Sequence, residues 1–257
     1  MRAKERLEKI KVFVNDYDRV SISFLQQQLE VSKKTVYRDI QELEENGFLR
    51  RVKKGAIRID DSFVQSDSSF FKRIELNKEK KLDIVKKSIE LIDEGDSIGL
   101  DAGSTSYLLA TQIIKLNLPN LTIVSNNIIA IIELAKNTNL NILVIGGILR
   151  NVSFVSSGPV AEKMLEEIQL SKVFITAEGI SDNGRLSDPN ISGGVIKKKI
   201  MDKSKIKILI LDSTKFGVTS LYNFAHISEF NYIITNKDLN KNHYNMLKEN
   251  GLNIILI

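Results

Sequence analysis

The segment Asp101-Ala102-Gly103-Ser104-Thr105 has residue types suited to binding a phosphate group. It follows one expected strand and opens an expected helix. Gly103 lets a ligand approach the backbone closely, and Ser104 and Thr105 offer hydroxyl and N–H donors beside the positive end of a helix dipole. Taken alone, the motif is more typical of a tight turn that caps its helix and binds nothing. The phosphate interpretation therefore depends on the neighbouring strand ends.

Three other expected strands end in residues that suit the same ligand: Gly146-Gly147, Glu178, and Asp212 with Lys215. Because ligands of parallel α/β sheets bind at the carboxyl ends of the strands, these residues are expected to converge on one site. Lys215 would neutralise a phosphate, while Glu178 and Asp212 would accept hydrogen bonds from sugar hydroxyls. Each has a structural alternative, namely a surface lysine, a capping carboxylate or a plain glycine turn.

A third group of chemically capable residues lies near the N-terminus. Ser32 is suited to cap a helix, and basic and polar side chains crowd the turns after it: Lys33, Lys34, Thr35, Tyr37 and Arg38. Such turns enter the major groove of DNA in helix-turn-helix proteins. More basic residues fall on a following expected hairpin: Arg50, Arg51, Lys53, Lys54 and Arg58. We expect those on the hairpin to contact the DNA backbone or minor groove.

The elements around Ser32 match a winged helix-turn-helix. Hydrophobic periodicity predicts helices over 3–15, 21–29 and 32–45, the last ended by Gly47. Two short strands, 48–52 and 56–59, would form the wing. The alternative is a solvated basic helix, because residues 1–60 hold 14 Lys and Arg against 10 Asp and Glu, a net charge of only +4. The order of three helices and a hairpin favours DNA binding.

The rest of the chain predicts a larger α/β domain. The polar stretch 61–75 is expected to be a linker between a DNA-binding domain, 1–60, and an effector and oligomerisation domain, 76–257. From residue 78 onward, helices alternate with short, continuously apolar strands such as 206–211. Buried parallel strands have this pattern. The sequence therefore predicts a mostly parallel sheet with helices on both faces.

Composition excludes several classes of site. The 257 residues include no cysteine and two histidines, which excludes disulfides and Cys-ligated zinc and argues against a His-rich metal site. A net charge of +5 permits a nucleic-acid partner without requiring one. The charged N-terminus does not resemble a signal peptide, and no apolar run has the roughly 18 residues of a membrane span. We expect a cytoplasmic protein with no metal, cofactor or membrane partner.

The helix around Ser32 also carries a family resemblance. Val-Ser-x-x-Thr-Val-Tyr-Arg-Asp-Ile over 31–40, followed by Leu43-Glu44-x-x-Gly47, resembles the helix-turn-helix signature of the DeoR family of bacterial sugar-metabolism repressors. That family usually has Arg where Tyr37 stands, and Gly-Gly-Ala where this chain has Lys54-Gly55-Ala56. The first difference concerns the operator sequence rather than the fold.

The resemblance extends over most of the chain. Matching positions follow in order: Lys81 with Ile84, Gly95-Asp96, Asp101-x-Gly103-Ser104-Thr105, Ser125-Asn126, Gly146-Gly147, Gly158-Pro159, Glu178-Gly179-Ile180 and Asp212-Ser-x-Lys215-Phe216-Gly217. The family's effector domain is similar to ribose-5-phosphate isomerase and typically responds to phosphorylated sugars. The resemblance implies that Gly103, Ser104 and Thr105 hold phosphate, and that Lys81, Asp212 and Lys215 take part in the response. Glu178 stands where the family often has Asp.

Two functions remain in view from the sequence. The first is a ligand-controlled repressor that binds operator DNA as a dimer or tetramer, with a phosphorylated sugar as effector. The second is a sugar-phosphate isomerase with a DNA-binding appendage, in which Asp101, Glu178 or Asp212 would act as general base. No complete acid–base set can be assembled, and the isomerase motif Asp-Gly-Ala-Asp-Glu is reduced to Thr-Ala-Glu-Gly over 176–179. We therefore expect a repressor with no catalytic residues.

Overall fold

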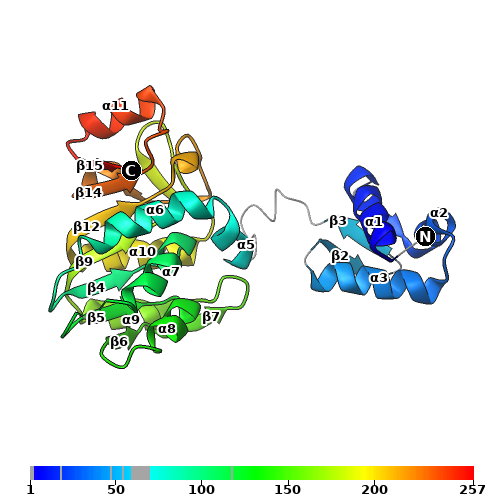
Figure 1. Ribbon diagram of the computed structural model, residues 1–257, viewed down its shortest axis with the longest axis horizontal. Helices are drawn as coiled ribbons and strands as arrows, with labels where there is room; N and C mark the ends of the chain where they lie inside the picture. The colour runs from blue at the N-terminus through cyan, green and yellow to red at the C-terminus, as the bar shows by residue number, and fades with distance from the viewer. Residues whose placement is uncertain (1–2, 18, 47, 54, 59–69, 117) are drawn as a thin grey trace. The chain divides into compact units, whose positions relative to one another are not determined.

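The computed structural model describes residues 3–17, 19–46, 48–53, 55–58, 70–116 and 118–257. Contacts divide the chain into two compact units, Met1–Asp67 and Ser68–Ile257 (Figure 1). Gly47, Lys54 and the first part of the expected linker, 61–69, lie outside the described residues, so their predicted roles stay predictions.

The N-terminal unit has the expected three helices and a wing. Its elements are α1 (Ala3–Tyr17), β1 (Arg19–Ser21), α2 (Ile22–Leu29), α3 (Lys33–Glu45), β2 (Leu49–Val52) and β3 (Gly55–Arg58). The strands form an antiparallel sheet in the order β1-β3-β2, so the predicted hairpin gains β1 as a third strand. Ile10, Leu25 and Ile40 from the three helices are buried together with Leu49 of the wing.

The C-terminal unit is built on a sheet of seven parallel strands in the order β15-β14-β12-β9-β4-β5-β6. Their bounds are β4 (Ser97–Leu100), β5 (Thr122–Ser125), β6 (Asn141–Val144), β9 (Leu170–Ile175), β12 (Ser204–Ile210), β14 (Tyr232–Thr235) and β15 (Asn253–Leu256). The predicted strand 206–211 agrees with β12 to within two residues at either end.

Helices cover both faces of the sheet, and each face has its own core. One core contains residues of α6 (Lys78–Ile89), α7 (Ser104–Ile113) and α8 (Ile128–Leu134), which lie side by side in Figure 1. The other contains residues of α9 (Pro159–Glu166), α10 (Ile191–Asp202) and α11 (Lys241–Glu249). Consecutive strand residues alternate between the two, since Val173 packs in the second core and Phe174 in the first. The predicted α/β class is confirmed.

Several short elements were missed by the sequence analysis. Residues 70–75 of the expected linker are instead helix α5 (Phe70–Glu75), with Phe70 and Ile74 buried in the first core. After β6 comes a hairpin of β7 (Ile148–Arg150) and β8 (Val155–Ser157). A small antiparallel sheet combines β10 (Gly179–Ile180), β11 (Arg185–Asp188) and β13 (Tyr222–His226). Among the described residues, no helix is long and apolar enough to cross a membrane.

The strand order reverses beside β4. The chain runs from β4 outward to β5 and β6, and then returns to the other side of β4 as β9. In open α/β sheets, ligands usually bind at the carboxyl edge beside such a switch point. Asp101 and Thr176 stand directly at the ends of these two strands.

Candidate functional site

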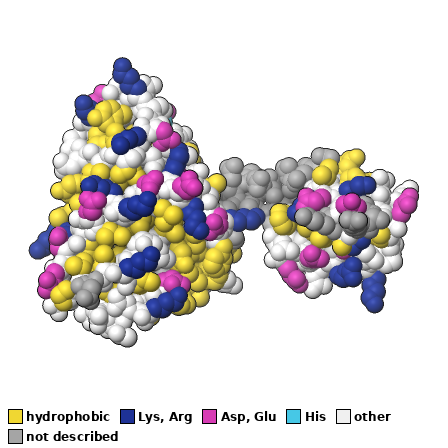
Figure 2. All heavy atoms as spheres, viewed as in Figure 1, with side chains coloured by type: hydrophobic (Ala, Val, Ile, Leu, Met, Phe, Trp, Pro, Cys, Tyr) yellow, Lys and Arg dark blue, Asp and Glu magenta, His cyan; other side chains and the backbone are white. Residues whose placement is uncertain are grey.

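Helix α3 presents one buried and one exposed side. Val36, Ile40 and Leu43 are buried, which leaves the basic and polar side chains of the first turns exposed: Lys33, Lys34, Tyr37 and Arg38. Figure 2 shows Lys and Arg side chains gathered on the lower side of the N-terminal unit, where α3 lies in Figure 1. Hydrophobic packing therefore fixes which side of α3 is available to DNA.

Two local interactions hold α3 in place. Ser32 caps the helix as predicted, since its Oγ accepts from the N–H of Thr35 at 3.2 Å. The buried guanidinium of Arg6 on α1 donates two hydrogen bonds to Asp39, one from Nη2 at 2.9 Å. The hydrogen bonds and charge of Asp39 raise the pKa of Arg6. This ion pair ties α1 to the recognition helix.

The basic residues of the wing give weaker support for a DNA contact than those of α3. Arg51 and Lys53 are exposed, as DNA contacts need to be. Glu44 of α3 accepts from the N–H of Arg51 at 2.7 Å and lies 3.8 Å from its guanidinium. Part of the Arg51 charge is therefore balanced within the unit.

In the C-terminal unit, the β4–α7 loop depends on a glycine. Gly103 is the N-cap of α7 and has no side chain with which to cap it, so the first N–H groups of the helix have no side-chain cap. A Cβ at Gly103 would lie 2.0 Å from Thr176 Oγ1, so no other residue fits without a shift. Of the two predicted hydroxyls, Ser104 is partly exposed and Thr105 is buried.

Most hydrogen bonds of Asp101 are made within the β4–α7 region and to Thr176 at the end of β9. Its buried carboxylate accepts from Gly103 N at 3.1 Å, from Thr176 N at 2.9 Å and Oγ1 at 2.7 Å, and from Ser106 Oγ. It also pairs with the buried ammonium of Lys197 on α10. Burial raises the pKa of Asp101, but Lys197 and these donors outweigh it and hold that pKa below its ordinary value. We therefore expect Asp101 to shape the loop.

Lys81 links the site to α5. It is buried on α6, and its Nζ donates to the carbonyl of Leu76 at 2.6 Å and to that of Arg73. Burial lowers its pKa to about 8; the Asp212 carboxylate opposes this, while Lys215 and Arg73 add to it. Lys81 thus lies near the predicted pair Asp212 and Lys215 while it holds the end of α5.

The ends of β9 and β12 supply a second ion pair. Lys215 Nζ lies 3.0 Å from Glu178 Oε1, and both side chains are about three-quarters buried. Asp212 is buried and accepts from the N–H of Thr214 at 3.1 Å. Thr214 Oγ1 accepts in turn from Asn77, the N-cap of α6, at 3.1 Å. The structure therefore brings Glu178 and Lys215, from the ends of two strands, into contact, with Asp212 at the start of the turn that carries Lys215. Lys81, which the family resemblance and not a strand end implied, lies close enough for the charges of all three to act on its pKa. Their contact with an effector stays a prediction.

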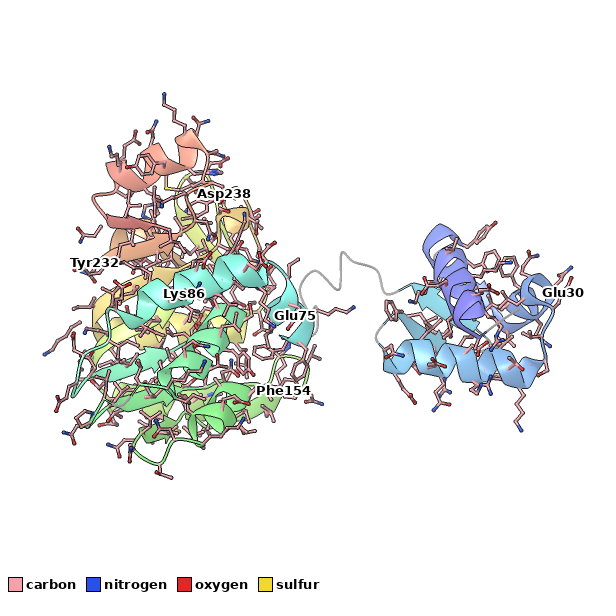
Figure 3. All side chains as sticks on the ribbon, viewed as in Figure 1. Glu30, Glu75, Lys86, Phe154, Tyr232 and Asp238 are labelled. Atoms are coloured by element: carbon pink, nitrogen blue, oxygen red, sulfur yellow. The ribbon has the colours of Figure 1, made fainter. Side chains whose placement is uncertain are left out.

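Arg73 on α5 is the functional candidate that the sequence analysis missed. Its Nε is buried and finds no hydrogen-bond partner among the described residues. Its charge adds to the lowering of the Lys81 pKa, and the Lys81 ammonium donates to the carbonyl of Arg73 itself. Burial and the same charge oppose the net rise in the pKa of Lys197, which Asp101 and Asp188 cause. Figure 3 labels Glu75 at the end of α5 and Phe154, whose ring lies 6.4 Å from that of Phe70 and 5.7 Å from that of Phe71. This aromatic packing fixes the helix that carries Arg73.

The remaining predicted pair, Gly146-Gly147, lies apart from these charges. It follows β6, which is two strands away from β4. Gly147 has a φ of +127°, and a Cβ there would lie 2.5 Å from the carbonyl oxygen of Ser157 in β8. These glycines let the chain turn closely against β8. Their predicted contact with the effector stays a prediction.

Comparison with known proteins identifies both units. The model of the DeoR-like helix-turn-helix domain matches residues 6–62, and that of the DeoR C terminal sensor domain matches residues 76–237. The sensor match alone spans more than half of the chain.

Similar relatives cover nearly the full length. An L-fucose operon activator of Haemophilus influenzae is 31% identical over 92% of this chain and 93% of its own. A lactose phosphotransferase system repressor of Staphylococcus epidermidis is 31% identical over 94% and 95%. The uncharacterized HTH-type transcriptional regulator YulB of Bacillus subtilis is 30% identical over 93% and 91%.

Among solved structures, ribose-5-phosphate isomerase A of Neisseria gonorrhoeae is 17% identical with a TM-score of 0.42, over 56% of this chain and 55% of that one. No conclusion about function follows from a likeness of this size. The family matches and the relatives do support one. The chain belongs to the DeoR family of bacterial transcriptional regulators, and it is a DNA-binding regulator rather than an enzyme.

Proposed function

We propose that the protein represses a carbohydrate operon and releases its operator when a phosphorylated sugar binds the C-terminal unit. The observation that carries this proposal is the buried Nε of Arg73, beside Lys81, for which the described part of the chain offers no hydrogen-bond partner. A buried donor without an acceptor costs free energy, and an anionic ligand would supply that acceptor. The named lactose repressor and L-fucose activator support a sugar-related role.

The geometry suggests how such a ligand would be held. The phosphate would accept from the uncapped N–H groups of α7 and from Ser104, with Arg73 and Lys81 balancing its charge. The sugar hydroxyls would donate to Glu178 and Asp212. Glu178 is paired with Lys215 in the structure. When the ligand binds, a sugar hydroxyl would replace Lys215 as the partner of the Glu178 carboxylate, so that this carboxylate would not be left without a donor.

Transmission to DNA would run through α5. Lys81 donates hydrogen bonds to the carbonyls of Arg73 and Leu76, at the C-terminal end of α5. Among the described residues, α5 is the first helix after the DNA-binding unit. A phosphate that attracts Lys81 and Arg73 would compete with those bonds and favour a different position of α5. It controls DNA binding only if its affinity differs between the two positions.

We further propose that the repressor acts in the cytoplasm as a dimer or tetramer, because helix-turn-helix proteins usually pair to match paired half-sites. Exposed recognition helices on two chains would read one operator together.

Fluorescence polarisation with labelled DNA from upstream of its own gene tests the proposed function. The titration is repeated with a panel of aldose, ketose and polyol phosphates at fixed salt, because phosphate contacts make DNA affinity salt-dependent. We expect one sugar phosphate to weaken DNA binding at micromolar concentration, whereas the free sugar and inorganic phosphate do not. A reporter gene behind the same DNA should be expressed more strongly when the regulator is deleted. Unchanged DNA affinity with every compound would contradict the proposed control.

A further inference from the structure

Strand β6 forms an edge of the seven-stranded sheet. It pairs with β5 on one side, and within the described part of the chain no strand pairs with its other side. Its sequence, Asn141-Ile142-Leu143-Val144, contains no charged residue and no proline. Natural edge strands are usually protected by charges, prolines or bulges, because an open edge can pair with another chain. This edge lacks the first two of those protections.

The side chains of β6 are also poorly covered. Leu143 is 38% exposed and Val144 is 40% exposed. Since they are consecutive in a strand, they point to opposite faces of the sheet. The apolar run from Ile142 to Ile145 is typical of a strand buried on both faces, yet a single chain leaves its two central residues, Leu143 and Val144, exposed.

The apolar surface continues past β6 into the β7–β8 hairpin and α9. Four large aliphatic side chains there are exposed: Ile148 at 72%, Leu149 at 48%, Val152 at 46% and Val160 at 62%. Figure 1 places β6 at the outer margin of the sheet, the last strand after β5. Exposed apolar patches of this kind mark interaction surfaces.

We infer that a second copy of this chain covers this surface, with the two β6 strands antiparallel across a two-fold axis. A two-fold axis pairs an edge strand with itself, so the same N–H and C=O groups complement each other without any further segment. The absence of charge in β6 removes the like-charge repulsion that self-pairing would otherwise bring. The sheet would then continue from one chain into the other, and the exposed hairpins would cover apolar surface on both.

The opposite edge of the sheet fits this role less well. Strand β15 also lacks a partner on its outer side among the described residues. However, Ile254, Ile255 and Leu256 are all partly buried, and Ile254 and Ile255 pack against the two cores. Of the two edge strands, β6 is therefore the one whose apolar side chains a single chain leaves exposed.

This inference rests on the proposal that the protein works as an oligomer, and the experiment separates the two. Light scattering after size exclusion should give the full-length protein at least twice the chain mass of 29.0 kDa. Val144→Lys and Ile148→Lys should each weaken self-association at least tenfold, because either buries a charge in the pairing. Leu221→Lys is the matched control, since Leu221 is 74% exposed and lies just before β13, outside this surface. Far-UV circular dichroism should show the wild-type fold in all three, because the three side chains are exposed in the single chain.

Crosslinking gives a second readout, because the chain has no cysteine of its own. Leu143→Cys should form a dimer with a short bismaleimide reagent, and Leu221→Cys should not. A monomeric wild-type protein at 50 µM, the concentration chosen for the measurement, would overturn the oligomer and this surface together. A wild-type oligomer that both lysine variants retain, or that the Leu221 control loses equally, would overturn the surface alone.

Discussion

Lys81 is a buried ammonium group whose charge can be removed near neutral pH. Burial lowers its pKa to about 8, below the ordinary 10.5, so the group is protonated at pH 7 and loses its proton as pH rises through 8. The second ionisation of a phosphate monoester is near pH 6, so the ligand charge is nearly constant above pH 7. Any loss of binding between pH 7 and 9 would then come from the protein.

We predict that effector affinity falls by up to about tenfold between pH 7 and pH 9, which is the limit for the loss of one proton from a group with a pKa of about 8. A hydrogen bond to a charged group contributes about 1.5–3 kcal/mol, and about 1.4 kcal/mol corresponds to a factor of ten. Isothermal titration calorimetry with the sugar phosphate found by the operator titration measures this. Lys81→Arg stays protonated over the range and should show a flatter profile. A wild-type affinity that does not change with pH would exclude Lys81 as the charge that holds the phosphate.

Arg73 offers the second test at the residue scale. Arg73→Lys keeps a positive charge but removes the buried Nε that has no partner among the described residues. We expect effector affinity to fall about tenfold, because a planar fork that donates two parallel bonds is lost. Stability should be unchanged or slightly higher, since an unsatisfied buried donor disappears. Lys72→Met, at an exposed neighbour on α5, is the control and should bind the effector like wild type. Equal affinities for the Arg73 variant and wild type would remove Arg73 from the site.

At the scale of elements, α3 should be separable into a packing side and a DNA side. Arg38→Ala removes an exposed cation from the first turns and leaves Val36 and Ile40 in the core. We predict at least tenfold weaker operator binding with little change in thermal stability. Glu45→Ala, exposed in the last turn of the same helix, should bind DNA about as well as wild type. Equal DNA affinity for the two variants would contradict the assignment of the groove-facing turns.

The Asp101–Lys197 pair joins the β4–α7 loop to α10, and its loss should lower the free energy of unfolding of the C-terminal unit. We predict that Lys197→Met destabilises the C-terminal unit by about 3–5 kcal/mol, because the buried Asp101 carboxylate is left uncompensated. The double change Lys197→Met with Asp101→Asn should recover part of that loss, since no buried charge remains. Urea unfolding monitored by circular dichroism measures both. A single variant as stable as wild type would show that the pair does not hold the loop.

The sequence predicted the elements that have a clear period. The apolar stripe Val36, Ile40 and Leu43 identified α3, and the continuous apolar strands identified the sheet. The two residues of β10 and the six residues of α5 offer too few positions for a period to appear, and β13, Tyr-Asn-Phe-Ala-His, lacks the continuous apolar run of the strands in the main sheet. They were missed for these reasons.

From the residues alone, the candidate site was predicted only where its residues follow the end of a predicted strand. Asp212 and Lys215 follow β12 directly, so parallel topology alone brings them to the right edge. Lys197 is 96 positions from Asp101 and looks like any basic residue of an amphipathic helix. Arg73 lies in a stretch that polar composition marked as linker. Pairings across such distances depend on tertiary packing, which single-sequence patterns do not record.

At the scale of the whole molecule, the two units have separate cores, and the effector and the operator would bind different units. Control therefore requires a coupling free energy between the two binding events. Coupling of this kind is reciprocal: a ligand that weakens a second ligand's binding is itself weakened by the same factor. Coupling free energies of 1–3 kcal/mol, or about 5–150-fold, are typical.

We predict that saturating operator DNA raises the dissociation constant of the effector by the same factor by which the effector raises that of the operator. Titration of the sugar phosphate by calorimetry, with and without operator duplex, measures the first factor, and polarisation measures the second. Arg38→Ala is the internal control, since it should bind effector like wild type in the absence of DNA but need at least tenfold more duplex for the same effect. If the effector weakens DNA binding while DNA leaves effector affinity unchanged, the two units are not in equilibrium coupling. Release would then require another route, such as competition between phosphate and DNA for the same cations on α3, and inorganic phosphate would reproduce it.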